Sequence, residues 1–138
     1  MRTINLFISG GMVFFSLFVA FDACSEDNNQ LPLDSLLGKY EGRIQIHSAR
    51  QPDYDYQTEI VSVDKSANTV SLVAQCQQCS TKAWKRNNCA LTEAQKSIKF
   101  TCKTKNGDEE YIFNGENLRA TGYGANYPQT ISVKKMVK

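Results

Sequence analysis

The stretch SIKFTCKTKNGDEEYIF, residues 97–113, alternates apolar and polar side chains on both sides of a turn signal. Every second residue is apolar from Ile98 to Cys102, and the alternation resumes after the turn. A period of two predicts a strand with one buried face. The dipeptide Asn106-Gly107 between two such runs is the strongest short signal for a hairpin. The stretch therefore predicts two antiparallel strands joined by a tight turn.

The same alternation recurs along most of the chain, and it predicts about seven strands with almost no helix among them. A sheet that curls and closes removes the exposed edges that invite aggregation. The predicted fold class is therefore all-β: a single small antiparallel up-and-down β-barrel or a half-open sandwich, following an N-terminal signal segment. The predicted strands are 40–47, 56–63, 69–76, 97–104, 109–113, 118–122 and 130–137.

Residues 77–95 break this rhythm, and we expect them to form an irregular excursion between two strands. The excursion holds the only Trp of the chain, Trp84, followed by Lys85 and Arg86. Long loops in small domains often carry function. A contact with a partner and a cap pinned by disulfides are both open interpretations of this segment.

Size and charge restrict the class of protein. The chain has 138 residues, which is enough for one domain. Its 16 Lys and Arg residues nearly balance 14 Asp and Glu residues. A nucleic-acid binder usually shows a strongly basic face. No nucleic-acid partner is therefore expected.

The N-terminus has the layout of a secretory signal. Arg2 supplies a positive charge, and residues 4–21 are uncharged and mostly apolar. A membrane-spanning helix needs about 20 apolar residues. The run lies at the edge of that length, and the pair Gly10-Gly11 weakens it as a helix. Export is the expected role of this segment, with an uncleaved membrane helix as the alternative.

The end of this segment, Phe21-Asp22-Ala23-Cys24, resembles the lipobox of bacterial lipoproteins, although Asp22 departs from the small residue found there. The resemblance implies a signal peptide at 1–23, a lipidated Cys24 carrying palmitate, and a polar tether at 24–32. The protein would then be a lipoprotein of the bacterial cell envelope, anchored to a membrane and facing the periplasm or the exterior. Pairing of Cys24 with another cysteine is the alternative.

Cys76, Cys79, Cys89 and Cys102 form an even set once Cys24 is set aside. Disulfides form in the oxidising space outside the cytosol, so two bridges are expected. Three pairings are possible, and a bridge from Cys76 to Cys79 is the one we disfavour. Zinc and redox exchange are weaker interpretations, since only one close pair is present and no thioredoxin-like pattern surrounds it. No metal and no cofactor are expected.

The residues that could support catalysis are few. His47 is the only histidine and lies on the polar side of a predicted strand. Asp53 and Asp55 lie in a predicted loop, but calcium requires six to eight oxygen ligands. No nucleophile and base can be paired from these residues. We therefore predict that the protein is not an enzyme.

The segment Gly38-Lys39-Tyr40, which follows a short turn rich in Leu, resembles the start of lipocalin-like barrels. The resemblance implies a lipocalin-like β-barrel domain at 33–138, in which Lys134 or Lys135 from the last strand packs over Tyr40. It also implies a small apolar ligand in the barrel mouth, or a protein partner in the envelope. The expected ligand-binding residues are Tyr54, Tyr56, Tyr123 and Tyr127.

The stretch 121–127, TGYGANY, resembles a loop of the membrane-bound inhibitors of C-type lysozyme. In that family a Ser and an Arg enter the lysozyme cleft, and Thr121 and Asn126 stand at their places here. Asn126 lacks the charge that would contact catalytic carboxylates. Glycines of a strand-connecting turn explain the same stretch equally well. The resemblance implies lysozyme inhibition as an alternative function.

Overall fold

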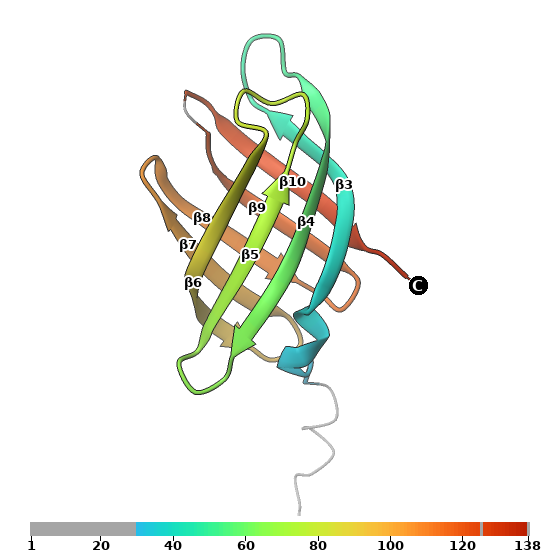
Figure 1. Ribbon diagram of the computed structural model, residues 1–138, viewed down its shortest axis with the longest axis vertical. Coiled ribbons are helices and arrows are strands. Elements are labelled where there is room, and N and C mark those ends of the chain that lie inside the picture. Colours follow the sequence, from blue (N-terminus) through green and yellow to red (C-terminus); the bar gives the residue numbers. More distant parts are fainter. Residues whose placement is uncertain (1–29, 125, 138) are drawn as a thin grey trace, which may run out of the picture. The chain divides into compact units, whose positions relative to one another are not determined.

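The computed structural model describes residues 30–124 and 126–137, and these form a closed antiparallel barrel (Figure 1). Each strand pairs with its neighbour in sequence, and β10 pairs with β3 to close the circle. This is the predicted all-β barrel, closed rather than half-open. The predicted signal peptide at 1–23 and Cys24 lie outside the described residues. The eight strands are β3 (Gly38–Ile46), β4 (Asp53–Asp64), β5 (Thr69–Gln75), β6 (Ala83–Ala94), β7 (Ile98–Thr104), β8 (Gly107–Phe113), β9 (Asn117–Tyr123) and β10 (Pro128–Lys135).

The strand that the sequence did not predict is β6, which occupies most of the expected excursion at 77–95. Its pairing shifts register twice, between Val70 and Leu72 on the β5 side and between Leu91 and Glu93 on the β7 side. Asn88 also has a positive φ of 56°. A bulge inserts an extra residue and reverses the alternation beyond it. The expectation of an irregular segment was wrong because these bulges hide the period of two.

The inward faces of the strands form one core. Tyr40 and Phe113 meet edge to face with ring centroids 5.9 Å apart, and Phe100 and Tyr111 stack at 4.6 Å. Such aromatic pairs add to the free energy gained by burying apolar area. The barrel is a separate compact unit, Leu31–Lys138, and its core and both disulfides lie inside that unit. We therefore expect residues 31–138 to fold without the rest of the chain.

One end of the barrel is closed by the short 3₁₀ helix η2 (Leu33–Leu36), and the β3–β4 and β5–β6 loops lie at the opposite end (Figure 1). Leu36 is fully buried, and its carbonyl accepts a hydrogen bond of 2.7 Å from the Tyr40 hydroxyl. The Lys135 ammonium lies 5.9 Å from the Tyr40 ring centroid and donates to the Ser35 carbonyl. Of the two lysines proposed to cover Tyr40, the structure therefore selects Lys135.

Within the described residues, no helix has the length and hydrophobicity needed to cross a membrane.

Closure of the barrel requires a glycine at position 42. Gly42 pairs with Val133 across the β3–β10 seam. A Cβ at this position would lie 2.8 Å from the Val133 Cα and closer still to the Ser132 carbonyl oxygen. Both are backbone atoms, so no side-chain movement relieves the overlap. The two closing strands therefore depend on the absence of a side chain here.

We predict that Gly42→Ala lowers the free energy of unfolding of residues 31–138 by about 3 kcal/mol or more, because the overlap is with backbone. Urea denaturation measures this change. Gly124→Ala is the matched control, since its new Cβ is crowded only by the movable end of the Gln129 side chain, at 2.9 Å, and meets the Tyr127 backbone oxygen at an ordinary contact distance of 3.6 Å. Equal stability of the two variants would contradict the close approach at Gly42.

Candidate functional site

A cavity of about 720 Å³ lies at the barrel end opposite η2. It is bordered by the loops that join β3 to β4, β5 to β6, β7 to β8 and β9 to β10. Cavities that hold small ligands usually measure about 300–1,000 Å³. Below, the cavity is called the mouth cavity. Its size and position make it the candidate functional site.

Three of the four tyrosines predicted to bind a ligand line the mouth cavity, namely Tyr54, Tyr123 and Tyr127. Tyr123 and Tyr127 are about half exposed, which places them at the rim. Tyr56 does not line it, because it lies two residues deeper along β4 and is buried in the core. Its ring instead packs against Trp84, with centroids 5.8 Å apart. The structure therefore brings Tyr54, Tyr123 and Tyr127 together around the cavity and separates Tyr56 from them.

Trp84 and Arg86 also line the mouth cavity, and both are carried by β6. The Arg86 guanidinium carbon lies 5.9 Å from the centre of the Trp84 ring, within the range of a cation–π interaction. Both side chains are partly buried, whereas Lys85 between them is exposed. The sequence alone contains no signal for this placement of Arg86, because Lys85 and Arg86 are both cationic.

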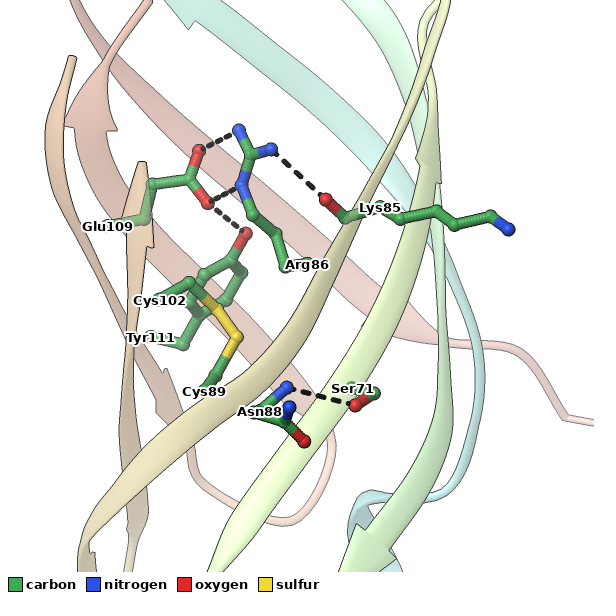
Figure 2. The surroundings of a disulfide bond; sticks show 8 residues. All are labelled: Ser71, Lys85, Arg86, Asn88, Cys89, Cys102, Glu109 and Tyr111. Carbon is green, nitrogen blue, oxygen red and sulfur yellow. Dashed lines mark hydrogen bonds and ion pairs between the residues drawn. A yellow bond between two sulfur atoms is a disulfide. The ribbon is translucent and has the colours of Figure 1, made fainter. Parts of the chain in front are cut away.

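Beneath the mouth cavity, Arg86 forms a two-bond ion pair with Glu109 of β8 (Figure 2). Arg86 Nε and Nη2 donate to the two carboxylate oxygens at 2.9 and 3.0 Å, and the Tyr111 hydroxyl donates to Oε1 at 3.0 Å. The Glu109 side chain is only 2% exposed, against 22% for Arg86. Sequence analysis missed Glu109, although it shares the strand face of Tyr111. The barrel interior therefore holds a charged network.

The surroundings of this network fix its protonation states. Burial lowers the pKa of the Arg86 guanidinium, but hydrogen bonding and charge attraction to Glu109 outweigh that effect and the net pKa is raised. Burial raises the pKa of the Tyr111 phenol well above its ordinary value, and the charges of Tyr56 and Glu109 raise it further. At neutral pH, Arg86 is thus a cation and Tyr111 a hydrogen-bond donor to Glu109.

Gly122 of β9 leaves room for this network. A Cβ on Gly122 would lie 2.8 Å from Glu109 Cγ and 3.3 Å from its Cα. The glycine that resembles part of an inhibitor loop therefore has a packing role here: it allows the Glu109 stem to lie against the β9 backbone.

Two buried polar atoms near the cavity have no hydrogen-bond partner among the described residues, Trp84 Nε1 and Tyr56 Oη. The Thr58 and Tyr111 hydroxyls are close enough to act on the pKa of Tyr56, but neither makes a hydrogen bond of normal geometry with it. Buried polar groups are nearly always paired. The Trp84 ring lines the mouth cavity, but its Nε1 atom is itself buried.

The four described cysteines pair as Cys76–Cys79 and Cys89–Cys102. Our expectation against a Cys76–Cys79 bridge was wrong. A tight turn after β5, in which Cys79 N donates to the Cys76 carbonyl at 3.2 Å, brings the two Cα atoms to 5.3 Å. That separation suits a disulfide. The second bridge joins β6 to β7 below Arg86 (Figure 2), so it alone ties two strands together.

The remaining candidate residues lie outside the cavity. His47 is exposed, and its Nε2 lies 2.8 Å from the Thr130 hydroxyl. Asp53 and Asp55 both pair with Arg43 on the barrel surface, Asp53 at 2.8 Å. The described part of the chain contains no group of three or more His, Cys, Asp or Glu side chains that could hold a metal ion.

Of the described residues in the 121–127 segment, the first three belong to β9 and the rest lie between β9 and β10. Thr121 pairs with Thr130 and Glu110 inside the sheet, and Gly124 N donates to the Tyr127 carbonyl at 2.9 Å. Asn126 lines the mouth cavity beside the rim tyrosines. Of the two residues aligned with the inhibitor family, one therefore lies in a strand and the other at the cavity rim.

Comparison with protein-family models, with curated proteins and with solved structures gave no match to the chain. What the mouth cavity binds is therefore inferred from its own residues.

We predict that Glu109→Ala lowers the free energy of unfolding of residues 31–138 by about 3–5 kcal/mol, because it leaves the partly buried Arg86 charge without its partner. Urea denaturation measures the change. Arg43→Ala, which breaks the exposed ion pairs with Asp53 and Asp55 instead, is the control and is expected to have little effect. A Glu109→Ala barrel as stable as the Arg43→Ala barrel would show that the network is not a structural element.

Proposed function

We propose that the protein is a non-enzymatic, lipid-anchored protein of the bacterial cell envelope that binds a small ligand in the mouth cavity. The observation that carries this proposal is the cavity itself, about 720 Å³ in volume and open at one end of a closed barrel. Ligand sites combine apolar walls with a few polar groups that fix orientation. The mouth cavity has both kinds of group.

The wall of the cavity suits a ligand with an apolar body. Ile44 and Ile46 of β3 and the Trp84 ring contribute apolar surface, and the rim tyrosines add aromatic faces. Aromatic side chains bury much area for few rotatable bonds. An envelope protein that inserts a side chain into the same cavity is a second form of this proposal.

The lipid anchor is the second part of the proposal. The four described cysteines pair with one another, which leaves Cys24 available for acylation. Disulfides form outside the cytosol, in agreement with an exported chain. Each buried CH₂ group of an acyl chain contributes about 0.8 kcal/mol, so two or more chains anchor a protein stably.

Lysozyme inhibition through 121–127 is the alternative proposal. One observation favours it: Tyr123 and Tyr127 are 55% and 48% exposed, as contact residues of a protein partner would be. The ligand proposal is preferred because the same tyrosines border the cavity.

We predict that residues 31–138 bind N-phenyl-1-naphthylamine, a neutral apolar fluorophore, in the mouth cavity. Trp84 is the only Trp, so its emission should fall as the probe's emission rises through energy transfer. Tyr123→Ala combined with Tyr127→Ala should weaken binding about tenfold through loss of aromatic contact. Ile112→Ala, which is exposed on β8 away from the cavity, is the control.

Binding that is unaffected by loss of both tyrosines would place the probe elsewhere and contradict the proposal. Inhibition of a C-type lysozyme by a barrel that binds no probe would favour the alternative.

We predict that the full chain incorporates radiolabelled palmitate in bacteria and that Cys24→Ala abolishes the label. Ser25→Ala, next to the acylation site, should retain it. Gel fluorography or mass spectrometry of the membrane fraction reads the result. Label that persists in Cys24→Ala would refute the anchor without affecting the ligand proposal.

A further inference from the structure

We infer that the ligand of the mouth cavity is an amphiphilic organic anion whose oxyanion group is bound by Arg86. This inference rests on the proposed ligand-binding function and names the chemical class of the ligand. The first observation in support is the charge of the residues that line the cavity. Arg86 and Lys105 line it, and no Asp or Glu among the described residues does. A cavity whose charged lining residues are all cations attracts an anion and disfavours a cation.

The second observation is that the positive member of the buried ion pair faces the cavity. Glu109 is 2% exposed and lies behind Arg86, whereas the Arg86 side chain is 22% exposed and reaches the cavity wall. A ligand in the cavity therefore meets the positive end of this pair and is shielded from the negative end. Partial burial of Arg86 makes the attraction stronger than it would be in bulk water.

The third observation is that some N–H groups of Arg86 remain free to bind a ligand. Its Nε and Nη2 each donate one N–H to Glu109, and Nη1 donates one to the Lys85 carbonyl at 3.2 Å (Figure 2). A guanidinium has five N–H groups. One N–H on each terminal nitrogen is thus left for a ligand. Two such donors on one planar group match two oxygens of a carboxylate, sulfonate or phosphate.

Glu109 and Tyr111 position the Arg86 guanidinium. Two bonds from Glu109 fix the plane of the guanidinium, and the Tyr111 hydroxyl fixes Glu109 in turn. A donor that is already held in place loses less conformational entropy when it binds a ligand. The Trp84 ring centre lies 5.9 Å from the Arg86 guanidinium carbon, so a ligand bound to Arg86 also needs an apolar part. The site therefore selects a molecule with both an anionic group and an apolar body.

The test compares two probes that share one skeleton: N-phenyl-1-naphthylamine, which is neutral, and its 8-sulfonate, 1-anilinonaphthalene-8-sulfonate. Residues 31–138 are titrated with each probe while energy transfer from Trp84 is recorded. We expect the sulfonate to bind at least tenfold more tightly. Arg86→Gln combined with Glu109→Gln removes both charges of the pair at once, and should bring the ratio of the sulfonate affinity to the neutral-probe affinity down to about one.

Two single variants control for charge outside the ion pair. Lys103→Gln removes a cation whose side chain is 86% exposed and lies outside the cavity, and it should preserve the preference. Lys105→Gln removes the cation at the rim. If Lys105→Gln cancels the preference and the double variant does not, the assignment to Arg86 is overturned.

A measurement on the unaltered barrel covers the case in which the double variant does not fold. The side-chain Nε–H signal of Arg86 in a nitrogen-15 spectrum should shift with the sulfonate and stay in place with the neutral probe. Equal affinities for both probes, with no such shift, would overturn the oxyanion inference and leave the proposed function standing. Binding of neither probe would instead contradict the proposed function.

Discussion

The pairing of β10 with β3 is the constraint on which the rest of the structure depends. It joins the two ends of an eight-strand meander, and it brings Gly42 so close to the Val133 backbone that no side chain fits between them. Among the strands that the structure describes, closure leaves no edge for other chains to pair with. It also encloses the inward faces completely. With η2 over one end, ligands have access to the interior from the mouth.

The interior is not uniformly apolar, and its polar part is concentrated below the mouth cavity. Taking Arg86 and Glu109 out of water costs free energy that their attraction only partly returns, so a buried ion pair is weak evidence of stabilisation. Apolar residues of similar size would fold at least as well in many barrels. The position of the pair suggests a different reason for it. Glu109 holds a guanidinium at the cavity wall, where its remaining N–H groups can meet a ligand.

Alternation predicted seven of the eight strands, because one buried and one exposed face impose a period of two on the sequence. Alternation did not predict β6, because bulges and the positive φ of Asn88 shift which residues of this strand face inward. The rim tyrosines were predictable as aromatic residues near strand ends, but the depth of Tyr56 depends on how the strands are staggered, which no local pattern records. Glu109 had a readable position beside Tyr111. The position of its partner Arg86 could not be read from the sequence, because Arg86 was assigned to a loop.

Amide hydrogen exchange, followed residue by residue in the barrel, tests most directly whether the chain closes as described. In a closed barrel the amides of β3 and β10 that face each other across the seam, around Ile44 and Ile131, are hydrogen-bonded and exchange as slowly as those of β7 and β8. In an open sheet β3 and β10 are edges, and the amides on their outer sides exchange quickly. Slow exchange at the seam is the predicted result, and fast exchange confined to the facing sides of β3 and β10 would contradict the closed barrel and the cavity built on it.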